Sequence, residues 1–257
     1  MKISSFFHFA KFGVRTILFK KREPILGTII LTDKCNLQCR HCSVNNITAV
    51  LYPYAQIREE MRQLYDMGVR ILFFCGGETF LWRDGDRERH NAIRGDTYDT
   101  IMQNIQNAAS DNICIYMAIN RVNKDAVRHV CLTARDTPNI RAVSFNFHTP
   151  YPDTRQLALS QTQKAECREV ITEMMKAGVP VFNLRSAFPY LVTGSFPTPC
   201  HQCVVMENGK LSICGRCIEV PGLCEACGYF FVAEYTLLFS GNPKIILEML
   251  MTYLKYI

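Results

Sequence analysis

The sequence lacks an apolar run long enough to span a bilayer, which takes about 20 consecutive apolar residues in a helix. It also lacks a recognisable secretory signal, because its N-terminus has no clean apolar core followed by a small-residue cleavage site. We therefore expect a cytoplasmic protein. Cytosolic chains rarely keep structural disulfides, so disulfide bonding is not expected to explain its cysteines.

Acidic residues are absent from the first 22 positions. The same stretch carries six cations, namely Lys2, Lys11, Arg15, Lys20, Lys21 and Arg22. The other 23 Lys and Arg are balanced by 23 Asp and Glu, so the rest of the chain is formally neutral. A generally basic surface for nucleic acid is therefore not indicated, and we expect no nucleic-acid partner.

The segment 1–23 is apolar and aromatic as well as basic. A helix of this composition can lie on an anionic membrane surface, which would make the protein membrane-peripheral. The alternatives are a helix packed across the main domain and a docking element. All three readings stay open at the level of sequence.

Thirteen cysteines among 257 residues are many, and most stand in Cys-x2-Cys or Cys-x3-Cys spacings. Such spacings bring neighbouring thiols to one point, which indicates metal ligation. Four cysteines stand alone in apolar contexts and are interpreted as small buried hydrophobic residues: Cys75, Cys114, Cys131 and Cys167.

Apolar strand-like runs alternate with helical patterns from residue 24 to about residue 190. This order predicts an α/β fold with a parallel sheet and helices outside it, of partial (βα) barrel type. Its ligands should sit beyond the carboxyl ends of the strands. The expected strands are Ile25–Leu31, Val69–Cys75, Ile113–Ile119, Ile140–Phe147 and Val179–Leu184, and Val69–Cys75 is expected to be buried. Ser160 and Gln163 form a capping-box pattern at the start of a helix that ends at Gly178.

Cys35, Cys39 and Cys42 follow the first expected strand as Cys-x3-Cys-x2-Cys. A [4Fe-4S] cluster has four irons, so three thiolates leave one iron open to another ligand. A zinc site or three unrelated buried thiols are the alternatives. A second motif, Gly76-Gly77-Glu78, follows the second strand, 34 residues after Cys42. Paired glycines allow a backbone to approach a ligand closely.

These two motifs, in this order and spacing, resemble the radical S-adenosylmethionine (SAM) superfamily. The resemblance implies that the open iron chelates SAM and that Gly76, Gly77 and Glu78 meet its amino group. It implies reductive cleavage of SAM to a 5′-deoxyadenosyl radical, which abstracts hydrogen from an unreactive carbon. A reductant such as flavodoxin or ferredoxin is the implied partner. Asn120, at another expected strand end, is a candidate contact to SAM or substrate. His148, at the end of the Ile140–Phe147 strand, is interpreted as a histidine satisfied by hydrogen bonds.

The C-terminal region, 191–257, holds three further Cys-x2-Cys pairs. They resemble the SPASM or twitch extensions that bind auxiliary [4Fe-4S] clusters, and the resemblance suggests a peptide or protein substrate. A zinc ribbon has similar spacing around a ten-residue hairpin and stays open as an alternative. The candidate ligands are Cys200, Cys203, Cys214, Cys217, Cys224 and Cys227.

One stretch departs from the family pattern. Asp84-Gly85, His90 and Arg94-Gly95 are similar to a family segment that ends the fourth barrel strand, yet Gly85 comes only seven residues after Glu78. No strand-like run exists between Phe80 and Ser110. We therefore expect a barrel shortened by about one and a half βα units. A truncated iron–sulfur protein without catalysis, or a zinc-binding interaction module, are rival functions.

Overall fold

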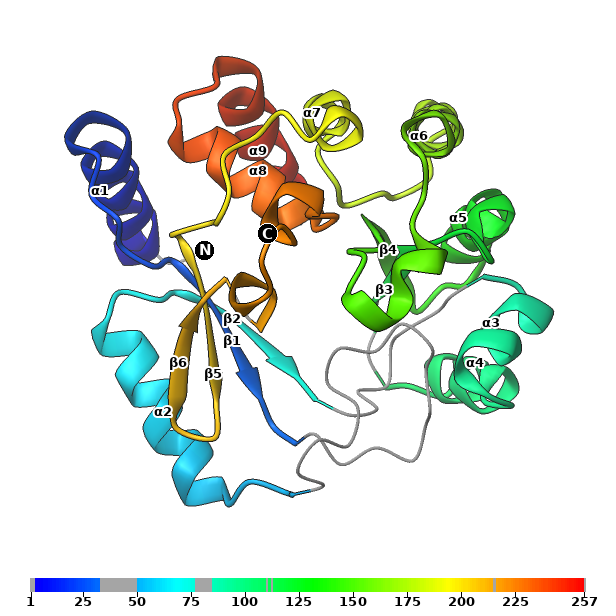
Figure 1. Ribbon diagram of the computed structural model, residues 1–257, viewed down its shortest axis with the longest axis horizontal. Helices are drawn as coiled ribbons and strands as arrows, with labels where there is room; N and C mark the ends of the chain where they lie inside the picture. Colours follow the sequence, from blue (N-terminus) through cyan, green and yellow to red (C-terminus); the bar gives the residue numbers. More distant parts are fainter. Residues whose placement is uncertain are drawn as a thin grey trace.

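The computed structural model describes residues 3–32, 50–76, 85–109, 111, 113–214 and 216–256. These residues form an α/β structure with two separate sheets (Figure 1). The larger sheet has the order β2-β1-β5-β6, and the smaller one pairs β3 with β4. The strands are β1 (Leu26–Ile30), β2 (Ile71–Cys75), β3 (Ile113–Ile119), β4 (Ile140–Phe147), β5 (Cys203–Glu207) and β6 (Lys210–Ile213).

Helices lie on the outside of these sheets, as expected for βα connections (Figure 1). Their bounds are α1 (Ile3–Phe19), α2 (Tyr54–Asp66), α3 (Arg87–Arg94), α4 (Tyr98–Gln106), α5 (Val127–Asp136), α6 (Gln161–Lys176), α7 (Phe188–Thr193), α8 (Phe230–Phe239) and α9 (Pro243–Tyr256). None of the described helices combines the length and apolar character needed to cross a membrane.

The strands β1, β3 and β4 confirm the sequence prediction, and each pairs in parallel with a neighbour. Strand β2 also forms, but the prediction that it is buried was wrong. Phe73 and Phe74 are each 49% exposed. Because successive residues of a strand point to opposite faces, both faces of β2 are partly open. Among the described residues β2 has only β1 as a neighbour, so little covers its outer side.

The fifth expected strand, Val179–Leu184, reduces to a single bridge between Val143 and Val181. Pro180 has no N–H to donate to a ladder. The next ladder position is filled by a side chain: the Asn183 carboxamide accepts from the Phe145 N–H at 2.7 Å and donates to the Phe145 carbonyl at 3.1 Å. The side chain of Asn183 thus replaces backbone pairing where the strand was expected.

Between β2 and β3 the described residues contain α3 and α4 and no strand. This agrees with the missing strand expected between Phe80 and Ser110. As a result β2 and β3 belong to different sheets, and the series of parallel strands is interrupted at this point. His90 is buried inside this helical segment and its Nε2 lies 3.0 Å from the hydroxyl of Thr97.

The main core lies between the smaller sheet and helices α5 to α9. Cys131 and Cys167 are buried in this core, as predicted for the lone cysteines. Cys75 and Cys114 were also expected to be buried, and that prediction was wrong: Cys75 is half-buried and Cys114 exposed. Both lie on the two strands that border the interruption, where a neighbouring strand is missing among the described residues.

Candidate cofactor and metal site

The three cysteines of the first motif, Cys35, Cys39 and Cys42, lie outside the described residues. The residues that flank them are described. The hydroxyl of Thr32 donates to the carbonyl of Val50 at 2.7 Å, and Thr32 forms an antiparallel bridge with Leu51. The two residues that flank the segment 33–49 therefore lie close together, just beyond the carboxyl end of β1.

Gly76 follows β2 directly and lies against Thr32. A Cβ atom at this position would come within 2.8 Å of the Thr32 carbonyl oxygen, a distance that real Cβ atoms essentially never show. Only glycine fits at this position without a shift of the backbone. Gly77 and Glu78 lie outside the described residues. The start of the Gly-Gly-Glu motif and the start of the cysteine segment are thus held next to each other.

Asn120 follows β3 and is fully buried. Its carboxamide oxygen accepts from the backbone N–H of Val122 at 2.8 Å and of Asn123 at 3.3 Å. Its Nδ2 is buried and has no hydrogen-bond partner within the described ranges. A buried amide donor without a partner is costly, so this atom is a candidate to meet a ligand.

Asn146, on β4, has the same property. Its oxygen accepts from the Phe230 N–H at 2.8 Å, while its Nδ2 is buried and lacks a partner in the described part of the chain. Ala118 pairs with Asn146 in the sheet, and Asn120 stands two residues further along β3. The two carboxamides therefore share one face of the sheet, here called the amide face: Tyr116, Ala118, Asn120, Ser144 and Asn146.

The C-terminal cysteine region packs against the end of β4. The Gly228 carbonyl accepts from the Phe147 N–H at 2.9 Å, and the Gly228 N–H donates to the hydroxyl of Thr149 at 3.0 Å. A Cβ atom on Gly228 would lie 2.0 Å from the Phe147 oxygen, so only glycine fits. Figure 1 shows this segment, in orange, in the middle of the molecule between the two sheets.

The hairpin β5–β6 carries the first two C-terminal cysteine pairs at its open end. The Sγ atoms of Cys200 and Cys203 are 2.8 Å apart, and the Cys214 N–H donates to the Cys203 carbonyl at 2.9 Å. Cys214 and Cys217 are hydrogen-bonded through their thiols. The ten cysteines within the described residues are all free thiols.

The third pair belongs to the same neighbourhood. Burial, together with the nearby thiols of Cys217, Cys224 and Cys200, raises the pKa of Cys227 to about 12. In contrast, the hydrogen bond with Cys214 lowers the pKa of Cys217 to about 7. Buried free thiols that interact with one another are a donor set suited to iron or zinc.

In the described parts of the chain, no three His, Cys, Asp or Glu side chains converge closely enough to ligate one metal ion. The contacts between their thiols place the six C-terminal cysteines in one region, but they do not form a metal-ligand shell in the described structure. Their assignment as metal ligands stays a prediction.

Two tyrosines that the sequence analysis did not single out connect the cysteine region to the amide face. Tyr229 is half-buried next to Tyr116 and is hydrogen-bonded to Tyr151, and desolvation raises its pKa well above the ordinary value. Tyr151 also hydrogen-bonds the Cys217 thiol. No local sequence signal could have identified them, because the contacts join residues far apart in the chain.

His148, also at the end of β4, was interpreted from sequence as a histidine satisfied by hydrogen bonds. This prediction is confirmed: its Nε2 lies 2.9 Å from the Thr154 hydroxyl and 3.2 Å from the Thr154 carbonyl, and its side chain is buried. These contacts to Thr154 hold the turn after β4.

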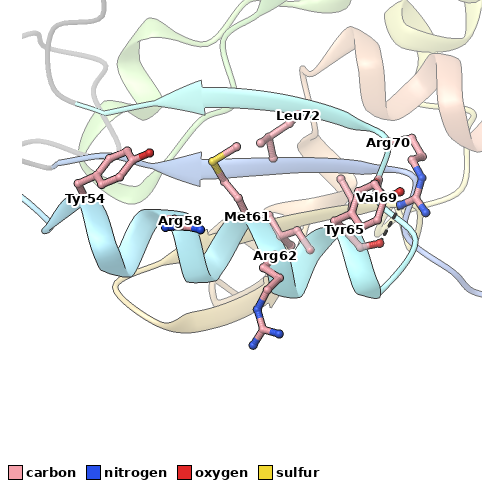
Figure 2. Close-up of a pocket in the computed structure, with 9 residues that line it drawn as sticks. Tyr54, Arg58, Met61, Arg62, Tyr65, Val69, Arg70 and Leu72 are labelled. Carbon is pink, nitrogen blue, oxygen red and sulfur yellow. Dashed lines mark hydrogen bonds between the residues drawn. The ribbon is translucent and has the colours of Figure 1, made fainter. Parts of the chain in front are cut away.

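A separate groove of about 490 Å³ lies between α2 and the outer side of β2. Figure 2 shows Tyr54 at one end of it, Met61 and Leu72 in the middle, and Tyr65 with Arg70 at the other end. Arg70 donates to the Tyr65 carbonyl and covers the Tyr65 ring. In a complete parallel sheet this side would be covered by a further helix. The groove is thus explained by the interruption after β2.

Comparison with solved structures gives the same architecture. The crystal structure of Streptococcus suis SuiB bound to S-adenosylmethionine matches with a TM-score of 0.60 and 13% identity over 93% of this chain and 70% of that chain. SuiB bound to precursor peptide SuiA matches with a TM-score of 0.59 and 14% identity, over 93% and 69% of the two chains. No curated protein sequence matches. The Radical SAM superfamily profile matches residues 29–194, and the chain belongs to this superfamily.

Proposed function

We propose that this protein is a radical SAM enzyme that modifies a peptide. Cys35, Cys39 and Cys42 hold a [4Fe-4S] cluster in this proposal, and Gly76, Gly77 and Glu78 contact SAM. When bound, the reduced cluster supplies the electron that splits SAM, and the 5′-deoxyadenosyl radical takes a hydrogen atom from the substrate. Membership of the superfamily supports the chemistry. The peptide substrate class is suggested by SuiB, whose structure was solved with a precursor peptide.

The observation that carries the proposal is the contact between Gly76 and Thr32. It holds together the starting points of the two segments that bear the family motifs. The amide face adds two buried donors, Asn120 Nδ2 and Asn146 Nδ2, that lack partners among the described residues. Donors of this kind are suited to the carboxylate, ribose or adenine acceptors of SAM, or to peptide carbonyls. Their role is to orient the bound molecules.

The C-terminal cysteines have a supporting role in this proposal. Cys200, Cys203, Cys214, Cys217, Cys224 and Cys227 provide ligands for one auxiliary [4Fe-4S] cluster, since their thiols lie in one region. Four thiolates suffice for such a cluster, so two of the six are spare or replaceable. A cytoplasmic reductant such as flavodoxin or ferredoxin supplies the electrons. Zinc at the same thiols is the competing occupant.

One observation favours a second function. The described parallel strands are interrupted between β2 and β3, and Phe73 and Phe74 of β2 are half exposed. A barrel with an incomplete wall encloses its cofactor and substrate less completely. The second candidate is therefore an iron–sulfur protein of the same ancestry that binds its cluster without productive cleavage of SAM.

Anaerobic reconstitution with iron and sulfide separates these functions. The protein is reduced, mixed with SAM and assayed for 5′-deoxyadenosine, with a Cys35→Ala, Cys39→Ala, Cys42→Ala variant as the matched control. Product that disappears in this variant supports the radical enzyme. A bound cluster without product, with and without candidate peptides, supports the second function. Tight zinc and no iron would contradict both.

The auxiliary site is tested on the same preparations. A Cys200→Ala, Cys203→Ala variant should lose about four irons and keep 5′-deoxyadenosine formation that depends on the first motif. The exposed Cys114→Ala variant is the control and should keep its full iron content. An unchanged iron content in this variant and also in a Cys214→Ala, Cys217→Ala variant would contradict the auxiliary cluster, because only two of the six cysteines can be spare.

A further inference from the structure

Helix α1 has two apolar faces: one packs against α8, and the other is largely exposed among the described residues. Phe12 and Thr16 are buried. Phe12 contacts Phe239 of α8 edge-on, with ring centroids 4.8 Å apart. Ile17 lies against the α8–α9 turn, next to Gly241. These contacts fix the rotation of α1 about its own axis, so that the opposite face has to point outward.

The outward face is apolar. Phe7, Val14 and Leu18 are 67%, 49% and 70% exposed, and their spacing places them on one side of the helix together with Lys11. Phe19, 69% exposed, extends this surface at the end of the helix. Figure 1 shows α1 at the margin of the molecule, beside α8 and α9. These five residues are called the α1 stripe.

Cations surround the α1 stripe. Lys11 lies within it, and Lys20, Lys21 and Arg22 follow it in an exposed loop. The loop is held by an ion pair between Arg15 and Glu23 and by a hydrogen bond from the Lys21 N–H to the Arg15 carbonyl. Glu23 is the first acidic residue of the chain, and this pair engages it. Residues 1–22, which include the stripe and its basic border, therefore carry positive charge and no acidic residue.

We propose that the α1 stripe docks on an anionic lipid surface. Exposed aromatic and aliphatic side chains would enter the boundary between headgroups and acyl chains, while Lys11, Lys20, Lys21 and Arg22 meet lipid phosphates. The uninterrupted positive charge favours this occupant, because an anionic membrane attracts a basic segment over a Debye length. This inference goes beyond the proposed chemistry and does not depend on it.

Vesicle co-sedimentation of the full chain tests the docking surface. The protein should pellet with vesicles of phosphatidylcholine and phosphatidylglycerol in equal parts, and far less with phosphatidylcholine alone. The Lys20→Gln, Lys21→Gln, Arg22→Gln variant should bind the anionic vesicles on the order of a hundred-fold less tightly, since each cation near such a surface contributes roughly five-fold. Phe7→Glu with Leu18→Glu should weaken binding roughly ten-fold or more.

Matched controls alter the same chemistry elsewhere. Leu211→Glu with Ile213→Glu changes two exposed apolar residues of β6, each 41% exposed. Arg62→Gln, Arg135→Gln, Lys210→Gln removes three cations whose side chains are 69%, 51% and 70% exposed. Both controls should bind anionic vesicles like the unaltered protein.

Three results would overturn the proposal. The first is equal binding to neutral and anionic vesicles, and the second is undiminished binding by the α1-stripe variants. The third is a dimer that forms without vesicles and is dissociated by Phe7→Glu with Leu18→Glu, which would make the α1 stripe an interface between two copies. All variants alter exposed residues, and an unchanged thermal midpoint shows that each one is folded.

Discussion

The carboxamide of Asn183 hydrogen-bonds both the N–H and the carbonyl of Phe145, as a neighbouring strand would. Asn183 is buried, so these two backbone groups have no access to water. The side chain therefore hydrogen-bonds the edge of the smaller sheet beyond the bridge at Val181, where no further strand pairs with β4 in the described structure.

Replacing the Asn183 amide should lower the free energy of unfolding. Asn183→Leu leaves two buried backbone groups of Phe145 unpaired, and each unpaired group costs about 1–3 kcal/mol, so we expect a loss of about 2–6 kcal/mol in the free energy of unfolding. The control is Asn139→Leu, whose amide donates to Ile105, Gln106 and Ala108 in a half-buried place that water can enter. Denaturant unfolding should show a clearly smaller loss for Asn139→Leu. Equal losses would refute the special role of Asn183.

The close contact between Gly76 and Thr32 can be tested by adding a methyl group at Gly76. In Gly76→Ala the added methyl group meets the Thr32 carbonyl, so β1 and β2 must separate at their carboxyl ends. Because a displacement of about 1 Å can cost a hundred-fold in rate, we expect 5′-deoxyadenosine formation to fall roughly ten-fold or more. Gly13→Ala is the control, since a Cβ there meets nothing within 4 Å and should stabilise α1 by about 0.5–1 kcal/mol. Unaltered activity of Gly76→Ala would contradict the proposed site.

Asn120→Asp removes an amide donor that has no partner among the described residues, and it keeps the oxygen that accepts from Val122 and Asn123. If the donor meets SAM or substrate, the dissociation constant should rise roughly 10–100-fold, because a hydrogen bond to a charged group contributes about 1.5–3 kcal/mol. Equilibrium dialysis of reconstituted protein with labelled SAM, and separately with peptide, measures this change.

The matched control for Asn120 is Asn123→Asp. The Asn123 amide donates to the Ala118 carbonyl at 3.0 Å, so its loss should lower the thermal midpoint and leave the dissociation constant of SAM unchanged. The same affinity in Asn120→Asp as in the unaltered protein, for both ligands, would show that its amide has no binding role.

Glu234 predicts a pH dependence of stability. Burial, with a smaller contribution from nearby Glu248, raises the pKa of this carboxyl to about 7, although the hydrogen bond that the Leu184 N–H donates to it acts in the opposite direction. The folded state therefore binds the proton more tightly than the unfolded chain. This contribution is fully present below about pH 4.5 and is lost as pH rises to about 7, on the order of 3 kcal/mol in total.

Glu234→Gln keeps an acceptor for the Leu184 N–H and cannot ionise. Stability measured by denaturant unfolding between pH 5 and pH 8, as chosen from the pKa above, should therefore fall less with rising pH in this variant. The half-buried Glu248, which accepts from Arg185 and Ser186, offers the comparison variant Glu248→Gln. Identical pH slopes in Glu234→Gln and the unaltered protein would contradict the raised pKa.

Local patterns predicted the elements that depend on local physics. The capping box of Ser160 and Gln163 is confirmed, with both of its hydrogen bonds at 2.9 and 3.2 Å. The hairpin between the cysteine pairs is also confirmed, because Asn208 and Gly209 accept the positive φ of a tight turn. Strands β1, β3 and β4 follow from their apolar, β-branched runs.

The errors and omissions have long-range causes. The apolar run Val179–Leu184 is typical of a strand, but its pairing stops at one bridge. Pro180 lacks an N–H donor, and Asn183 bonds Phe145 through its side chain instead of its backbone. The burial of β2 depends on a neighbour that the described residues do not provide. For the candidate site, Asn120 was placed correctly at a strand end, whereas its unpartnered Nδ2 became visible only in three dimensions.

Strand β5 lies parallel to β1, with Cys203 opposite Leu26 and Glu207 opposite Ile30. During synthesis from the N-terminus, β1 therefore cannot pair with β5 until most of the chain has been made. The larger sheet cannot be completed before the hairpin emerges, and the apolar residues Ile29, Val204 and Met206, which pack together in the finished sheet, stay apart until then. Such distant pairing folds slowly and exposes an edge of β1 to aggregation in the meantime. Chains cut shortly after residue 194 should accordingly be found in the insoluble fraction.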